Sequence, residues 1–350
     1  MSAPFDPSAA APEDSGIFGL PHGEDDAAVH VIPVPFDATT SYRKGTAKGP
    51  DAVFQASKQV DLFDVLTGRP YEAGIAMLTP DARIVAWNAE ASELAQPIID
   101  AGGVDDGTRE FRDALARVNA IGAELNELVE AACSRAFAAG KLVGLLGGDH
   151  STPFGAFVAA AKRWPGLGLL HFDAHADLRV AYEGFTWSHA SILHNATTRI
   201  AGIERVLQVG LRDLSEPEYD AIRTSRGRIE AVFDADWAFA RAEGANLRAI
   251  VRRAVERLPQ RVWVTFDVDG LDPTQCPNTG TPVPGGLSFN EAMLWLDELT
   301  KSGREIVGFD LNEVSPGDTT SDVDSWDAVV GARLLYRLIG FGLASRRGRP

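Results

Sequence analysis

The stretch LLHFDAHAD, residues 169–177, joins an apolar strand directly to several polar side chains. Its first part is largely apolar on both faces, which is typical of a strand in a parallel sheet that helices cover on each side. Asp173, His175 and Asp177 then alternate at every second position, so in an extended segment their side chains share one face. Burying two carboxyl groups and an imidazole without partners would be costly. The stretch therefore predicts a buried strand that ends at a metal site.

Strand and helix patterns alternate along the chain on both sides of this stretch. Predicted strands cover residues 29–34, 142–146, 168–172, 205–209, 229–233, 261–266 and 305–309. Predicted helices cover residues 111–139, 153–163, 216–224, 247–258, 288–300 and 326–338. Because no linker rich in Pro, Gly or Ser divides this core, we expect an α/β fold with one doubly wound, mostly parallel sheet.

Residues 1–27 differ from the rest of the chain in composition. They are rich in Ala, Pro, Ser and acidic residues and have no apolar period. We expect them to form a flexible N-terminal arm outside the core, and residues 28–350 to form a single catalytic domain.

The charge balance and the cysteine content exclude several classes of protein. Lys and Arg total 33 against 49 Asp and Glu, and no basic run interrupts this balance, which disfavours a nucleic-acid partner. The excess of acidic residues suits a cationic substrate, but a need for solubility alone would also explain it. Two cysteines cannot build a disulfide framework or a Cys-based zinc site. With neither a signal-like start nor about 18 consecutive apolar residues, we expect a soluble cytoplasmic protein without a membrane partner.

Two more predicted strands end in metal-ligand residue types. The motif GGDHS at 147–151 places His150 after the strand at 142–146, although a helix N-cap with an incidental histidine would look the same. The motif DVDGLDP at 267–273 places two carboxylates after the strand at 261–266. Ligand sites of open α/β sheets lie beyond the carboxyl ends of the strands. The predicted ligands are His150, Asp173, His175, Asp177, Asp267 and Asp269.

The predicted ligand set indicates the metal and the reaction class. The number of predicted ligands is larger than one tetrahedral zinc ion binds. Nitrogen and oxygen ligands favour ions such as Mn²⁺, although other divalent ions remain possible. Two ions that share bridging carboxylates can hold a hydroxide at neutral pH. The set therefore predicts a hydrolase with two metal ions per subunit.

Several motifs, in this order along the chain, resemble those of the ureohydrolases, the arginase and agmatinase family. They are SYRKGTAKGPDAV at 41–53, GGDHS at 147–151, DAHAD at 173–177, DVDGLDP at 267–273, TGTPVPGG at 279–286 and NEVSP at 312–316. The resemblance implies a three-layer α/β/α fold, assembly into homotrimers or homohexamers, and a binuclear Mn²⁺ centre. It also implies hydrolysis of a guanidinium group to urea and an amine.

By position, the resemblance assigns roles to individual residues. It implies that Asp173 and Asp267 bridge the ions, with His150 and Asp177 completing one site and His175 and Asp269 completing the other. We also expect a catalytic role for Asp177. Glu313 resembles the family glutamate that pairs with the guanidinium, unless it is a helix-start or surface carboxylate. His189 resembles the histidine that carries a proton to the departing amine, although a lone histidine is usually structural.

Three further residues near these motifs are Ala190, His171 and His194. Ala190 stands where many relatives have Gly, so we expect an effect on the loop that aims His189. His171 and His194 are expected to be structural, with a role behind the metal ligands left open for His171.

The loop LRVAYEGFTWS, at 178–188, is where the tail of the substrate should lie. Arg179 replaces the Asn that arginases typically carry, which favours agmatine over arginine and predicts formation of putrescine and urea, a step of polyamine metabolism. Glu183 could bind the distant ammonium or be a solvated charge, while Arg179 could instead receive a carboxylate tail. The alternatives are an arginase or another guanidino-acid or guanidine hydrolase, a two-metal phosphoesterase, and a catalytically silent metal-binding relative.

Overall fold

The computed structural model describes residues 5–105, 107–318 and 325–346, and its centre is one sheet. Within those ranges eight parallel strands pair in the order β2-β1-β3-β8-β7-β4-β5-β6. The strands are β1 (Val29–Val34), β2 (Ile75–Met77), β3 (Leu142–Gly147), β4 (Leu167–Phe172), β5 (Ile203–Leu211), β6 (Ile229–Phe233), β7 (Arg261–Asp267) and β8 (Glu305–Asn312).

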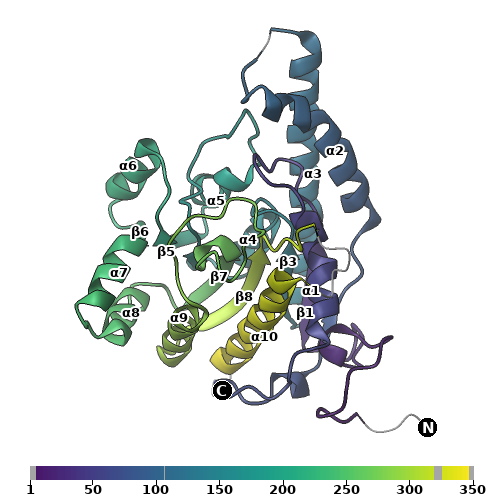
Figure 1. The fold of residues 1–350 in the computed structure, drawn as a ribbon, viewed down its shortest axis with the longest axis vertical. Helices are drawn as coiled ribbons and strands as arrows, with labels where there is room; N and C mark the ends of the chain where they lie inside the picture. Colours follow the sequence, from purple (N-terminus) through teal and green to yellow (C-terminus); the bar gives the residue numbers. More distant parts are fainter. Residues whose placement is uncertain (1–4, 106, 319–324, 347–350) are drawn as a thin grey trace.

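Helices cover both faces of the sheet, as Figure 1 shows. One face carries α1 (Gly49–Ser57), α8 (Leu247–Val255), α9 (Phe289–Lys301) and α10 (Trp326–Arg346). The other carries α2 (Ala82–Asp100), α3 (Arg109–Ala138), α4 (Phe154–Arg163) and α5 (Ile192–Arg199). Helices α6 (Glu216–Thr224) and α7 (Asp234–Ala242) lie beside β6. The short 3-10 helices are η1 (Ile17–Gly19), η2 (Thr46–Lys48), η3 (Pro70–Ala73), η4 (His189–Ser191) and η5 (Val268–Gly270). The expected three-layer α/β/α fold is confirmed.

Most of the predicted elements occur, and the omissions have physical reasons. All seven predicted strands form, whereas β2 was not predicted because three residues are too few to display a period. Helices α1, α2, α5 and α7 were also not predicted. Only four of the 19 residues of α2 are buried, and two of those four are alanines, so its apolar stripe is weak in the sequence.

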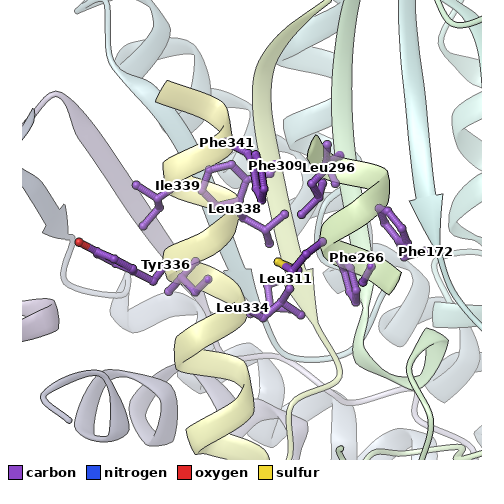
Figure 2. Close-up of a cluster of buried hydrophobic side chains, with 14 of the residues drawn as sticks. Phe172, Phe266, Leu296, Phe309, Leu311, Leu334, Tyr336, Leu338, Ile339 and Phe341 are labelled. Carbon is purple, nitrogen blue, oxygen red and sulfur yellow. The ribbon is translucent and has the colours of Figure 1, made fainter. Parts of the chain in front are cut away.

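Helix α10 packs along β8 and forms part of the core (Figure 2). Figure 2 shows Leu334, Leu338 and Phe341 of this helix clustered with Phe309 and Leu311 of β8. An 18-residue window of α10 has a mean hydropathy of 1.3, which meets the length and composition expected of a membrane span. However, 67% of that window is buried inside the molecule, so the hydropathy of α10 is explained by core packing.

The N-terminal segment departs from expectation. Ile17, Phe18 and Leu20 are buried in the same core cluster as α10, and the backbone N–H of Phe18 donates to Ser57 Oγ at 2.9 Å. The prediction that all of residues 1–27 lie outside the core is therefore wrong for this part. Four residues, IFGL, are too short a run to show a helical or strand period.

Candidate metal centre

The carboxyl ends of four neighbouring strands build the site. Strands β3, β8, β7 and β4 are adjacent in the sheet, and a polar segment follows each of them. His150 follows β3, Glu313 follows β8, Asp267 ends β7 and Asp173 follows β4. Because parallel strands place their carboxyl ends along one edge, chain segments far apart in sequence meet there.

The predicted ligand side chains lie together in two groups. In the first, His150 Nδ1 lies 3.1 Å from Asp173 Oδ2, 3.3 Å from Asp177 Oδ2 and 3.4 Å from Asp267 Oδ2. In the second, His175 Nδ1 lies 3.0 Å from Asp269 Oδ2 and 3.4 Å from Asp173 Oδ1. Asp173 presents one oxygen to each group, which is the arrangement required of a bridging carboxylate.

The electrostatics of this cluster fit divalent cations. Burial and the neighbouring Asp173 raise the pKa of Asp177 to about 8. Burial, Asp269 and Asp173 raise the pKa of Asp267 well above its usual range. So many buried carboxyl groups cannot all ionise unless positive charge compensates them, and cations would take the place of the shared protons. The residues present therefore suit a binuclear metal site.

A hydrogen-bond relay fixes the orientation of the His150 ring. Thr265 Oγ1 donates to Asp310 Oδ1 at 2.8 Å, so its lone pairs accept the Nε2–H of His150, also at 2.8 Å. Asp310 is buried and also accepts from Trp263 Nε1 and Asn312 Nδ2. Burial lowers the pKa of His150, but the hydrogen bonds of its ring to Asp173, Asp177 and Asp267 raise that pKa well above its usual range. A cation bound at Nδ1 would displace the proton there and leave the ring held by its Nε2–H.

Local backbone geometry places two of the acidic residues. Asp177 and Glu313 have φ values of 54° and 64°, a left-handed conformation that is uncommon for residues other than glycine. Gly148, two residues before His150, is needed for close backbone packing. A Cβ added there would clash with the carbonyl oxygen of Phe36, so Gly148 makes room for the segment after β1.

Glu313 is buried beside the backbone of His150. Its Oε1 accepts a hydrogen bond from the backbone N–H of His150 at 2.9 Å. Its Oε2 has no hydrogen-bond partner among the described residues. Burial, Asp267 and Asp149 raise the pKa of Glu313 well above its usual range. A buried acceptor of this kind is costly unless a donor from a ligand reaches it.

A cavity of about 300 Å³ opens over the second group. His175, Asp177 and His189 line its inner part. Burial, followed by the charge on His175, lowers the pKa of His189 to about 4, so this imidazole is neutral at neutral pH. Ala190 is not among the described residues with positive φ, so the alanine fits this loop without strain.

Arg179 lines the outer part of the cavity, but its charge is already partnered. Its guanidinium lies 5.0 Å from the centre of the Tyr182 ring, and its Nε is 3.7 Å from Glu218 Oε2. Glu218 itself accepts hydrogen bonds from the backbone of Leu178 and Ser215, so it serves the local structure.

Glu183 does not line this cavity, contrary to the expectation that it could meet the tail of a substrate. It takes a left-handed φ of 53° and packs against Gly103 in the connection between α2 and α3. The loop composition could not reveal this conformation.

The sequence reasoning missed Asp213 as a cavity residue. Asp213 forms a parallel bridge with His175, and its backbone N–H donates to Ala174 at 3.1 Å. Within the described ranges no hydrogen bond or ion pair holds its carboxylate. Its only signal in the sequence is its position just after β5, the strand next to β4.

Comparisons with known proteins agree with the fold and with the residue pattern. The family model described as "Arginase family" matches residues 27–340. The chain is 32% identical over 318 residues to the N(1)-aminopropylagmatine ureohydrolase of Thermus thermophilus, covering 90% of each. It is 31% identical over 313 residues to the agmatinase of Proteus mirabilis, covering 89% of this chain and 87% of that relative. The structure of agmatine ureohydrolase of Thermoplasma volcanium has a TM-score of 0.70 and 24% identity, covering 94% of each chain, a likeness of fold.

Proposed function

Since this chain belongs to the arginase family and is a ureohydrolase, we propose that it cleaves agmatine to putrescine and urea. The observation that carries the proposal is the buried Oε2 of Glu313, an unpaired acceptor beside the clustered His and Asp ligands. A planar guanidinium is the kind of donor that a carboxylate binds with two parallel hydrogen bonds.

We propose that the six clustered side chains bind two Mn²⁺ ions. Such a pair of ions supplies a water nucleophile with a lowered pKa and stabilises the negative charge that develops on the attacked group. Asp173, with one oxygen in each group, would bridge the two ions. Asp267, whose Oδ2 lies 3.4 Å from His150 Nδ1, would be the second bridging carboxylate. The two ions would also bring the pKa values of the buried carboxyl groups back toward their ordinary range.

The remaining residues then have the following roles in the proposed reaction. Glu313 orients the guanidinium so that its carbon faces the attacking water. Asp177 lines the cavity and accepts a hydrogen bond from that water. A C–O bond forms, the C–N bond to the alkyl chain breaks, and the departing nitrogen takes a proton. His189 is neutral and lines the same cavity, so it can accept the proton that the attacking water loses and deliver it to the leaving amine.

The outer cavity supports a cationic substrate tail. Arg179 is paired with Glu218, so the carboxylate of Asp213 is the charge that remains to bind a ligand in this region. Agmatine carries an ammonium at the end opposite its guanidinium, and that ammonium suits Asp213. The Arg179–Glu218 pair also weakens the alternative in which Arg179 receives a carboxylate tail.

Three further properties remain proposals. We propose a homotrimer or homohexamer, a cytoplasmic location and a single catalytic domain over residues 28–350. Cys133 and Cys276 are buried and unpaired, which is compatible with a reducing compartment.

A urea-release panel tests the function directly. With Mn²⁺ supplied, the purified protein is expected to release urea from agmatine faster than from arginine or guanidinobutyrate. A reversed ranking would discard agmatine as the substrate. Asp267→Ala should abolish urea release, whereas Asp272→Ala, a matched change in the same loop where the carboxylate binds Thr274, should retain it.

A further inference from the structure

His171 lies directly behind the shared carboxylate of Asp173. It is fully buried in β4, two positions before Asp173 on the same side of the strand, and its Nε2 is 2.9 Å from Asp173 Oδ2. His171 also falls within 4.8 Å of the potential ligand atoms of His150, Asp173 and Asp177. Its proximity alone would allow it to be either a metal ligand or a hydrogen-bond donor.

The hydrogen bonds on the far side of the ring decide between these two roles. Gln208 Nε2 lies 2.8 Å from the carbonyl oxygen of Ala176 and 3.0 Å from His171 Nδ1. A backbone carbonyl can only accept, so the nitrogen of the Gln208 amide must face it. The second hydrogen of the same amide then points at His171 Nδ1, which must accept it. The proton of the neutral imidazole is therefore on Nε2, directed at Asp173.

The two histidines near Asp173 Oδ2 thus differ in how their far nitrogen is held. The Nε2–H of His150 donates to Thr265 Oγ1, which leaves Nδ1 as the nitrogen that would lose its proton to a cation. In His171 the far nitrogen, Nδ1, accepts the Gln208 amide, so the neutral ring keeps its proton on Nε2, between the ring and Asp173.

We propose that His171 is a positioning residue that holds Asp173 in its bridging orientation and does not itself bind a metal. The backbone N–H of His175 donates to Oδ1 at 2.6 Å, and the ring of His171 donates to Oδ2. One donor on each oxygen fixes the plane of the carboxylate, which would leave each oxygen available to one ion. This inference rests on the ligand assignment proposed above.

A matched pair of substitutions tests the role of the N–H. Gln can place its side-chain N–H near the position of His171 Nε2, whereas Met has similar length and volume but no donor. We expect His171→Met to weaken Mn²⁺ binding about 10- to 100-fold, as loss of a partner behind a metal ligand typically does. His171→Gln should stay within a few-fold of the unmodified protein. Both affinities are measured by titration calorimetry with Mn²⁺ alone.

The electron paramagnetic resonance spectrum at saturating Mn²⁺ gives a second readout. In His171→Met the magnetic coupling between the ions should change, because the carboxylate between them is free to turn, while His171→Gln should keep the original spectrum. Equal behaviour of the two variants in affinity and spectrum would overturn the inference, as would loss of one whole ion from both, which would make His171 a ligand.

Further measurements keep the inference testable and separate from the proposed function. If His171→Met does not fold, Gln208→Met removes the donor that fixes the ring and should weaken Mn²⁺ binding in the same direction; unchanged binding would contradict the inference. The proposed function is judged instead on the unmodified protein, by its urea release and by its binding of two ions.

Discussion

Glu313 Oε1 accepts the backbone N–H of His150 at 2.9 Å, which ties the end of β8 to the segment after β3, while Oε2 is buried without a hydrogen-bond partner among the described residues. Glu313→Gln keeps an oxygen that can accept from His150 but loses the charge that pairs with a guanidinium. Hydrogen bonds to charged groups contribute about 1.5–3 kcal/mol, so kcat/KM for agmatine should fall about 10- to 150-fold. Mn²⁺ content should not change. Full activity in this variant would remove Glu313 from the proposed site.

Metal binding should depend on pH through the buried carboxyl groups. The pKa of Asp177 is raised to about 8 in the metal-free protein, so the folded chain keeps a proton that the unfolded chain has already lost. This proton stabilises the folded state fully at pH values below the pKa that Asp177 has in the unfolded chain. The stabilisation is lost as the pH rises through about 8, the pKa of Asp177 in the folded chain. Metal ions displace the proton, so affinity for Mn²⁺ should increase up to about that pH and then level off.

Proton release measures this linkage directly. Titration calorimetry in buffers of different ionisation enthalpy should detect protons released on Mn²⁺ binding near pH 7, and fewer near pH 9. The same proton release at both pH values, or none at either, would be incompatible with protonated ligands in the metal-free site.

Asp213 should select for the tail of the substrate. Asp213→Asn removes a charge without changing the size of the side chain. An ion pair at a partly exposed site is worth about 1 kcal/mol, so kcat/KM for agmatine should fall about 5-fold, while hydrolysis of butylguanidine, which has no ammonium, should be unaffected. An equal loss for both substrates would mean that Asp213 supports the loop and not the tail.

The buried part of the N-terminal segment should contribute to stability. Ile17, Phe18 and Leu20 lie in the core, and burial of each such side chain contributes about 1.5–3 kcal/mol. Deleting residues 1–21 should therefore lower the free energy of unfolding by roughly 4–9 kcal/mol, an upper range because unfolded chains also bury some apolar surface. Deleting residues 1–15 is the control and should cost much less. Denaturant titrations that give equal stability for both deletions would refute this role.

Much of the site could be predicted because strand periodicity carries three-dimensional information. Asp173, His175 and Asp177 alternate along one segment, His150 follows an apolar strand and Asp267 ends another, so a parallel sheet brings them to one edge. The sequence does not reveal that β8 lies between β3 and β7, which is what places Glu313 beside His150.

The residues that were not predicted act through contacts that no local pattern records. Thr265, Asp310 and Gln208 are polar side chains inside mainly apolar strands, and their roles depend on pairing between strands distant in sequence. The position of Glu183 outside the cavity could not be predicted for a different reason. Loop composition gives residue types but not the left-handed backbone that turns Glu183 toward Gly103.

The most direct test of the central claim is anomalous diffraction at the manganese absorption edge from crystals grown with Mn²⁺. Two peaks are expected about 3.5–4 Å apart, one beside His150 and one beside His175, with Asp173 between them. A single peak, or manganese bound elsewhere while the His and Asp cluster contains none, would contradict the account.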